Sequence, residues 1–392
     1  MNRSLPFLAL LALAGGAAGL AAQERDMRAH ELSLAATPTG SFAAWHGGTS
    51  AGSAIYVQKL DEAGRLSGAP FPVSDGKLLA YEPDLIDAGD RLVVAWYERD
   101  EASGALSARL AGMAANGRRL WSALLGTGPD STRNPVVRRI GDTLHVAWIA
   151  QPTAPDDGGN GASIRHQRFS LAGEPLAPAR EIGRANSDTW NLNAATCGDA
   201  FIVTYDAALE SKAHELHMLV VTGEAVTHRL LSPDDGHASL YPDLQVSDTG
   251  QAAITWFDEM DGNREIYLLT APFDWLAKGI VPAPRRISWS AGESTGAYLA
   301  WNGPTIGLAW IDEQDGRPRL FEQMFGTHGH PRGPARQLST PAQAEERAGV
   351  PAIRAQRGGF LVAWNDYVLE GDGPHRHSSS SIARTVWFPA AQ

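Results

Sequence analysis

Residues 91–97, Arg-Leu-Val-Val-Ala-Trp-Tyr, form a short apolar run that ends in aromatic residues and is followed by polar groups. Runs of this length rich in β-branched residues are typical of buried β-strands. The pattern recurs seven times at intervals of 51 to 57 residues, with its aromatic residue at Trp45, Trp96, Trp148, Tyr205, Trp256, Trp310 and Trp364. A period of this length indicates a repeat architecture.

Each period contains the same succession of strands and turns. In the second period, residues 83–87 and 91–97 are two strands separated by Ala88-Gly89-Asp90, and further strands follow at 105–111 and 119–125. Such strands make one antiparallel sheet. A sheet of about 50 residues cannot bury both faces alone, and radial stacking of repeated sheets closes a ring. The sequence therefore predicts an all-β fold, a single seven-bladed β-propeller of four-stranded antiparallel blades, with little helix.

The first 22 residues have the pattern of a signal peptide. Arg3 precedes an apolar stretch at 5–13 and small residues up to Ala22. The stretch is too short for a good membrane anchor, so we expect no membrane span after cleavage. We therefore expect a signal peptide at 1–22, a propeller at 23–392, and a periplasmic or secreted protein. The remaining 370 residues give about 53 per blade.

The end of the chain predicts how the ring closes. A strand at 382–388 is the third of the last period, and four residues remain after it. We expect a segment within residues 23–29 to supply the outer strand of the seventh blade, because an open sheet edge is a liability.

Composition limits the partners. The single cysteine, Cys197, cannot form an intramolecular disulfide, and we expect it to be an ordinary residue in a turn of the fourth blade rather than a reactive or metal-binding thiol. The net charge of −11 argues against nucleic acid as a partner. We expect a monomer that binds a glycan or a protein. The Gly- and Ser-rich inserts at 152–163 and 370–381 have the composition of linkers.

The topology of a propeller brings particular side chains together. The starts of the innermost strands and the ends of the second strands converge around the channel on one face, while the opposite face is made of Gly turns and is expected to offer little. Arginine suits carboxylate or sulfate, aromatic rings stack on sugars, and carboxylates accept hydroxyl protons. The candidate binding residues on this rim are Tyr81, Glu82, Arg99, Arg133, Asn134, Trp190, Tyr241, Asp258, Asp312, Arg347 and Asp366. No catalytic residue is assigned.

Structural roles compete with these assignments. The repeated tryptophans suit packing between blades. Asp258, Asp312 and Asp366 can instead accept backbone N–H bonds at a hairpin. The motif Trp-x-Asp-Glu-x-Asp-Gly at 256–262 and 310–316 places three acids close together, which leaves calcium open, although we expect no cofactor. The histidine pairs at 214/217, 328/330 and 375/377 have no evident third ligand, so we expect no metal there.

Residues 241–267 carry a family resemblance. The segment from Tyr241-Pro242-Asp243-Leu244 through 254–267, ITWFDEMDGNREIY, resembles the repeat of sialidase-like (BNR-type) propellers in secreted bacterial proteins. The resemblance extends over all seven periods and is clear in the second, fifth, sixth and seventh. It implies glycoside hydrolysis, with relatives that only bind glycans or serve as scaffolds. The Asp boxes of true sialidases, S-x-D-x-G-x-T-W, are absent from the corresponding turns at 61–64, 115–117 and 171–173.

Two functions follow from the rim and the resemblance. The first is an exported propeller that binds a glycan or a protein partner through the rim of its channel. The alternative is a glycan-active enzyme, a glycoside hydrolase or a polysaccharide lyase, using rim carboxylates, Tyr or His. Binding ranks slightly ahead, because no catalytic motif is recognisable. The observation that would help most to choose between the two is whether Arg99, Arg133 and Arg347 point at a common spot beside a carboxylate.

Overall fold

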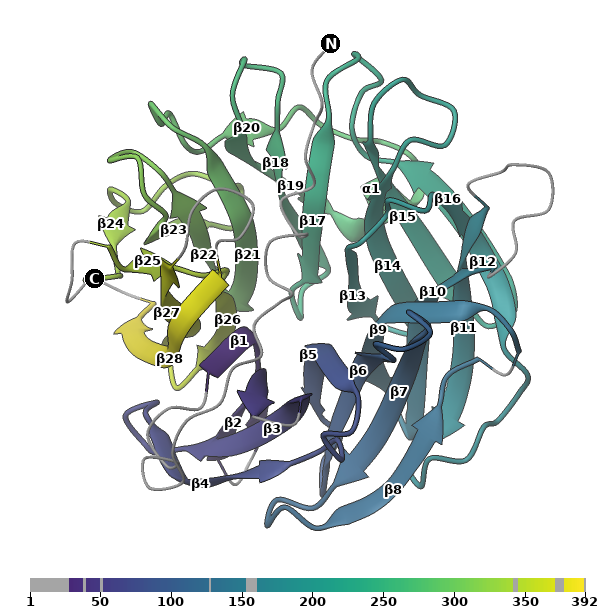
Figure 1. The fold of residues 1–392 in the computed structure, drawn as a ribbon. Coiled ribbons are helices and arrows are strands. Elements are labelled where there is room, and N and C mark those ends of the chain that lie inside the picture. Colours follow the sequence, from purple (N-terminus) through teal and green to yellow (C-terminus); the bar gives the residue numbers. More distant parts are fainter. Residues whose placement is uncertain are drawn as a thin grey trace.

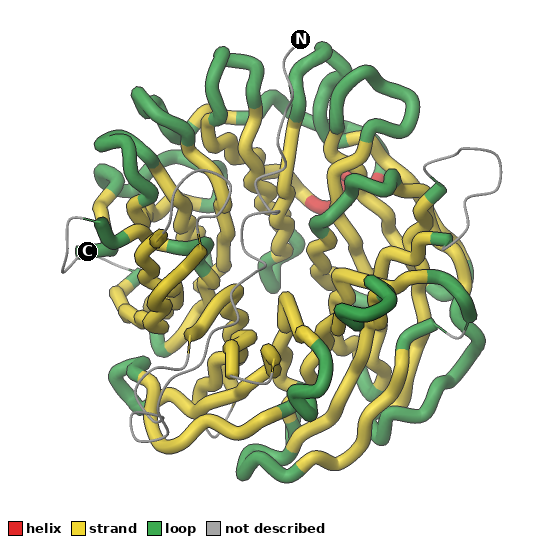
Figure 2. Tube along the Cα trace, viewed as in Figure 1, coloured by secondary structure: helices red, strands yellow, loops and turns green. Residues whose placement is uncertain are grey.

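The computed structural model is a ring of seven antiparallel sheets around a central channel (Figure 1). It describes residues 28–37, 40–49, 52–126, 128–152, 161–340, 345–370 and 377–390. The signal peptide expected at 1–22 and most of the two inserts lie outside these residues. One short helix, α1 (Phe273–Ala277), interrupts an otherwise all-strand fold (Figure 2). The predicted seven-bladed propeller is confirmed.

The strands follow the chain around the ring. The first three blades are β1 (Arg28–Thr37), β2 (Gly40–Thr49), β3 (Gly52–Leu60), β4 (Leu66–Pro72); β5 (Leu79–Asp87), β6 (Leu92–Arg99), β7 (Leu106–Met113), β8 (Arg119–Leu124); and β9 (Ser131–Ile140), β10 (Thr143–Gln151), β11 (Ala162–Ser170), β12 (Arg180–Ala185). The next three are β13 (Leu192–Cys197), β14 (Ala200–Ala207), β15 (Glu215–Thr222), β16 (Ala225–Leu230); β17 (Ser239–Val246), β18 (Gln251–Asp258), β19 (Glu265–Pro272), β20 (Arg285–Arg286); and β21 (Ser294–Asn302), β22 (Thr305–Asp312), β23 (Arg319–Gly326), β24 (Arg336–Gln337). The seventh is β25 (Arg347–Ala348), β26 (Ala352–Gln356), β27 (Gly359–Glu370) and β28 (His377–Pro389).

The closure predicted for the seventh blade involves residues 23–29, of which the structure describes Arg28 and Ala29. Its innermost position is shared by β25 and β26, which both pair with β27. Arg28 and Ala29 pair with Gly48 and Gly47 in the first blade, so the prediction that they add to the seventh blade is wrong. The physical reason is that β2 extends to Thr49 and pairs with the backbone of both residues. Residues 23–27 lie outside the described part of the chain.

Packing and hydrogen bonds join the first and seventh blades. Leu34 and Trp45 share a buried cluster with Leu361 of β27. The guanidinium of Arg354 donates from Nε to the carbonyl of Leu34, 2.9 Å away. Gly64 has φ +78° and lies so close to Leu361 that an added Cβ would be 2.6 Å from its Cδ1. A side chain at this turn would therefore clash at the closure.

The repeated tryptophans are buried and hydrogen-bonded to the acid two residues further on in four blades. The indole nitrogen of Trp256 donates to Asp258 Oδ2 at 3.0 Å. The same contact joins Trp96 to Glu98, Trp310 to Asp312 and Trp364 to Asp366. These are the four blades in which the family resemblance is clear. The Trp-x-acid motif is therefore a structural element of the repeat.

The other three blades carry Gly47, Ala150 and Ala207 at the position of the acid. There the buried polar atoms Trp45 Nε1, Trp148 Nε1 and Tyr205 Oη have no hydrogen-bond partner among the described residues. An unpaired buried donor is unfavourable, so these blades forgo part of the stabilisation that the acid supplies elsewhere.

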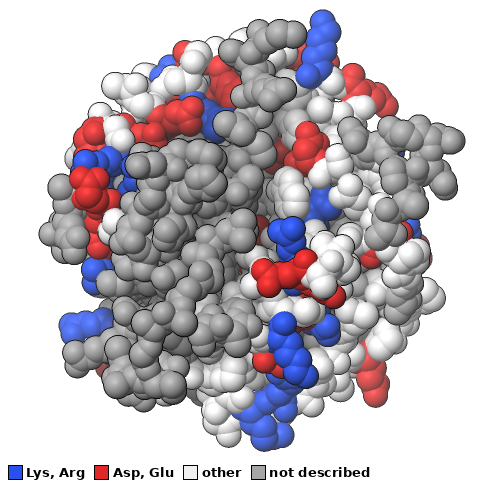
Figure 3. All heavy atoms as spheres, viewed as in Figure 1, with Lys and Arg blue, Asp and Glu red and all other residues white. Residues whose placement is uncertain are grey.

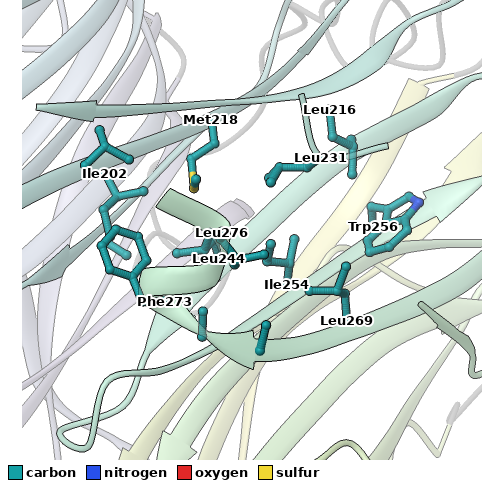
Figure 4. Packing of buried hydrophobic residues seen from close by; sticks show 14 of the residues in the cluster. Ile202, Leu216, Met218, Leu231, Leu244, Ile254, Trp256, Leu269, Phe273 and Leu276 are labelled. Carbon is teal, nitrogen blue, oxygen red and sulfur yellow. The ribbon is translucent and has the colours of Figure 1, made fainter. Parts of the chain in front are cut away.

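Neighbouring blades meet through apolar clusters. Between the fourth and fifth blades, Ile202 and Met218 face Leu244 and Ile254, with Trp256 at one end of the cluster (Figure 4). The helix α1 adds Phe273 and Leu276 to the same cluster. Cys197, the last residue of β13 before the hairpin to β14, packs against it as a partly buried free thiol.

Two histidine pairs lie within the third and fourth blades. His166 Nε2 and His145 Nδ1 are 3.2 Å apart, and His217 Nδ1 and His228 Nε2 are 2.9 Å apart. Such a ring-to-ring hydrogen bond needs one nitrogen with a proton and one without. Burial lowers the pKa of His145 to about 4, of His166 to about 3 and of His217 to about 4.

We expect acid to destabilise the protein through these pairs. A lowered histidine pKa means that the stabilisation is complete above pH 6.5 and is lost as the pH falls toward 4. A double variant, His145→Gln with His166→Gln, should have a lower melting temperature than wild type at pH 7. The difference in melting temperature should be smaller by about 2 °C or more at pH 4. Melting curves of both proteins across this range test it. A difference in melting temperature that stays constant or grows toward pH 4 would contradict the idea that the neutral His145–His166 pair stabilises the fold.

Candidate functional site

The innermost strands share a bulge near their first residues. The pairing register shifts there in β1, β5, β9, β17 and β21. Each bulge contains one residue with positive φ: Glu31, Glu82, Asn134, Tyr241 and Gly296. For residues other than glycine this conformation is uncommon and costs of order 1–3 kcal/mol. Backbone strain is therefore concentrated around one mouth of the channel.

In the second and fifth blades, the acid that follows the bulge ties the blade to the next one. Asp84 Oδ2 accepts the backbone N–H of Val137 at 2.7 Å, and Asp243 Oδ2 accepts that of Leu299 at 2.8 Å. The related segments at 81–84 and 241–243 thus have a structural function in the repeat.

Glu82 lies at the centre of the strained mouth. Its backbone N–H donates to Glu31 Oε2 at 2.9 Å, and the side-chain amide of Asn134 donates to its carboxylate. Burial and the charge of Glu31 hold the pKa of Glu82 well above its ordinary value, although Arg133 and Asn134 oppose the shift. The Glu31 carboxylate itself lies 2.9 Å from His46 Nδ1. Glu82 is thus buried beside a like charge, whereas the neighbouring Glu31 has a histidine partner.

Phenols and rings surround this carboxyl. Burial raises the pKa of Tyr97, Tyr241 and Tyr298, and the charge of Glu82 adds to the shift in all three. Tyr81 stacks on Tyr97 with ring centres 5.5 Å apart, and His46 meets the edge of Tyr81 at 5.4 Å. The mouth is therefore lined with amphipathic rings around one carboxyl group.

Arg133 holds the loop that carries Trp190. Its guanidinium donates to Gln151 Oε1 at 2.6 Å and to the carbonyls of Ser187 and Thr189 at 2.9 and 3.0 Å. It also lies over the Trp190 ring, 4.5 Å from the centre. Burial lowers its pKa to about 10, so it remains charged at neutral pH. Its terminal nitrogens are occupied by the protein, so Arg133 positions Trp190.

A buried ion pair borders the same loop. His214 Nδ1 is 2.8 Å from Asp206 Oδ2, and its Nε2 is 3.2 Å from Asp188 Oδ2. Asp206 Oδ1 also accepts the backbone N–H of Tyr241 at 3.0 Å, at the bulge of the fifth blade. Burial opposes protonation of His214, but the hydrogen bond and charge of Asp206, with help from Asp188, raise its pKa to about 9. The pair fixes the fourth blade against the fifth.

Several predicted site residues have other surroundings. Asp258 accepts bonds from Ser239 and Met260 as well as Trp256, Asp312 from Ser290 and Ser294, and Asp366 from Arg384. These carboxylates are occupied within or between blades, which agrees with the structural alternative. Arg99 is exposed, and its positive charge lies close enough to Tyr81 to influence the pKa of that phenol. Arg347 is half-buried, and its charge influences the pKa values of Glu313 and Tyr367. Neither arginine shares a partner with Arg133, so no contact in the described structure joins the three.

The three acids of the motif at 256–262, for which calcium binding was left open, each contact a different partner. Glu259 Oε1 lies 3.0 Å from Arg264, and Asp261 Oδ2 lies 2.9 Å from Arg286. Asp258 faces Trp256 instead. Among the residues described, no three His, Cys, Asp or Glu side chains are grouped so that they could hold a metal ion.

The structure thus brings together Tyr81, Glu82, Arg133, Asn134, Trp190 and Tyr241 from the predicted set. It adds Glu31 and Asp188, which the sequence reasoning missed. Glu31 could have been found from the period, since it lies 51 residues before Glu82 at the same bulge. Figure 3 shows acidic and basic side chains side by side near the middle of the face in view, next to the second and third blades.

Comparison with known proteins supports the fold. No protein-family model and no curated protein matches the chain. A protein of unknown function from Dyadobacter fermentans superposes with a TM-score of 0.54 and 10% identity over 92% of this chain and 95% of that one. An endosialidase of phage phi92 gives 0.53 and 11% over 94% and 68%. A neuraminidase-like protein of A/flat-faced bat/Peru gives 0.50 and 10% over 94% and 90%.

The chain is therefore a β-propeller with the fold of the sialidase-like proteins, as the resemblance implied. Identity this low establishes the fold alone. None of the helices in the described residues is long and apolar enough to cross a membrane.

Proposed function

We propose that this protein binds a glycan at the channel mouth defined by Glu31, Glu82, Asn134 and Trp190, and that it does so in the periplasm or outside the cell. The observation that carries the proposal is the Glu82 carboxyl, which is held on a strained bulge, has a raised pKa and is surrounded by phenols. Strongly shifted pKa values and strained backbone cluster at functional sites. The sequence of residues 1–22 is the basis for export.

The chemistry of the mouth suits a hydroxyl-rich ligand. A protonated Glu82 both donates and accepts hydrogen bonds, as sugar hydroxyls require. The buried Oδ1 of Asn134 has no partner among the described residues and is a further acceptor beside it. Half-buried Trp190 and Tyr81 provide ring faces on which a sugar can stack.

A glycan-active enzyme remains the second candidate, favoured by one observation. Burial and the charge of Glu31 raise the pKa of Glu82, while Glu31 is paired with His46, and neighbouring carboxyls with different environments are how acid and base roles are divided. In this reading Glu82 donates a proton to the leaving oxygen and Glu31 acts as base or nucleophile.

Glycan-array binding followed by calorimetry on the strongest oligosaccharide tests the proposal. The array should carry neutral, sialylated and uronate-containing oligosaccharides. We expect Trp190→Ala to weaken binding at least tenfold, because it removes the stacking surface. Glu82→Gln should bind within about threefold of wild type, because the amide mimics the protonated acid. Glu101→Gln, an exposed residue on the same face, is the matched control and should change nothing.

The same variants separate the binding protein from the enzyme. Release of reducing ends by wild type that falls at least a hundredfold in Glu82→Gln would establish catalysis. Binding without release establishes a binding protein. An array without a hit, or equal binding by wild type and Trp190→Ala, would overturn the glycan site.

A further inference from the structure

The far end of the channel contains a cavity of about 550 Å³. Every innermost strand contributes to its wall, from Leu34 in β1 to Arg354 in β26. It lies at the end formed by the Gly turns, which the sequence analysis expected to offer little. That expectation is wrong, because seven tapering blades leave a space that short turns do not fill.

Two guanidinium groups face this cavity. Arg138 is paired with Asp84 at 2.7 Å and donates to the carbonyl of Ala194 at 2.8 Å. Arg354 makes one hydrogen bond, from Nε to the carbonyl of Leu34, and forms no ion pair with a described residue. Its terminal nitrogens have no protein partner in the described structure, although the side chain lies deep in the channel. Burial and the nearby Arg138 lower the pKa of Arg354, and the charges of Asp84 and Asp243 oppose the shift.

An unpaired cation in a confined site is unfavourable unless an anion joins it. The guanidinium of Arg354 presents a flat pair of N–H groups, the arrangement that binds a carboxylate with two parallel hydrogen bonds. Arg138 is already paired with Asp84, which leaves the terminal nitrogens of Arg354 for a ligand, and the charges of Asp84 and Asp243 partly offset that of Arg354. Asp87 and the exposed Asp248 also line the cavity and oppose ligands with several negative charges.

The remaining wall offers groups for hydroxyls and one ring. Thr196, Gln245 and Ser247 line the cavity with polar side chains. Trp301 closes one side and is fixed by a hydrogen bond from Nε1 to the carbonyl of Gln245, 3.2 Å away. A ring face beside hydrogen-bonding groups suits a small polyhydroxylated molecule.

We propose that this cavity binds a small hydroxylated monocarboxylate of the sugar-acid class, with its carboxylate on Arg354. The site is separate from the channel mouth and does not depend on the function proposed there.

Isothermal titration calorimetry with glucuronate, galacturonate and gluconate tests the proposal, with glucose as the uncharged comparison. At least one of the three acids should bind, and glucose should bind at least tenfold more weakly. Arg354→Gln should weaken binding of the acid at least tenfold, since it removes the charge-assisted bonds. Arg357→Gln is the matched control, because Arg357 is exposed at the next turn and donates to the carbonyl of Glu62.

Two further measurements keep the test independent of the folding of Arg354→Gln. Thr249→Trp, at an exposed position of the cavity wall, should block the acid in a protein with an unchanged core. In wild type, the bound acid should slow modification of Arg354 by phenylglyoxal, read by mass spectrometry, and leave Arg357 unaffected. Failure of all three acids to bind, or no protection of Arg354, overturns the proposal. Loss of acid binding in Trp190→Ala but not in Arg354→Gln would assign the acid to the channel mouth instead.

Discussion

We expect Trp256→Ala to lower the free energy of unfolding by about 3–5 kcal/mol, the usual loss for a large buried aromatic side chain. Trp256 is 3% exposed and lies in the cluster that joins the fourth and fifth blades. Its removal leaves a cavity at this interface and leaves Asp258 without its indole donor. Urea unfolding followed by circular dichroism measures the loss.

A pair of conservative variants separates packing from hydrogen bonding. Trp256→Phe and Trp148→Phe remove a similar volume at equivalent positions, but only Trp256 donates to an acid, since Trp148 Nε1 is unpaired. We expect Trp256→Phe to lose about 1–2 kcal/mol more than Trp148→Phe. Equal losses in the two variants would show that the Trp-x-acid hydrogen bond contributes nothing.

We expect Asp206→Ala to lower the free energy of unfolding by about 3–5 kcal/mol near pH 6, because it removes the buried carboxylate that holds His214 and a backbone N–H of the next blade. The change removes the carboxylate from His214 and frees the N–H of Tyr241. Asp188→Ala is the matched control. Asp188 contacts the same imidazole at 3.2 Å, but its side chain is 68% exposed, so its loss should be about 0–1 kcal/mol.

The pH dependence follows from the raised pKa of His214. A raised histidine pKa means that the pair stabilises the fold fully below pH 6.5 and that this contribution disappears as the pH rises through about 9. The difference between wild type and Asp206→Ala should therefore shrink by about 2 kcal/mol between pH 6 and pH 10. Denaturant unfolding at both values measures it. A difference that is the same at both pH values would show that the pair is not what holds the two blades.

Part of the candidate site could be read from the sequence. Tyr81, Glu82, Arg133, Asn134 and Trp190 were found because propeller topology sends strand starts to one face. Their roles could not be read. Arg133 looks like a ligand-binding arginine in the sequence, but the carbonyls that occupy it belong to a loop 54 to 56 residues further on.

Acids of similar sequence context also differ in the structure. Asp206 and Asp258 each lie at the end of the second strand of their blade. Asp258 is bound by Trp256 and Ser239 of its own blade, whereas Asp206 holds His214 and the backbone of Tyr241 in the next blade. Asp206 directly follows its aromatic residue, whereas Asp258 lies two residues after Trp256, so the two side chains leave their strands on opposite faces, and the stacking of the sheets decides which partners each one meets.

The sequence by itself determined the number of blades, the position of each tryptophan and the turns between strands, because the period, the strand pattern and turn chemistry are local properties. Only the tertiary structure decided which carboxylates are occupied, that the pKa of Glu82 is raised beside Glu31, and that the terminal nitrogens of Arg354 face a cavity. The physical reason is that hydrogen-bond occupancy, desolvation and cavity shape depend on distances between residues about one blade or more apart in the chain, which exist only once the ring has closed.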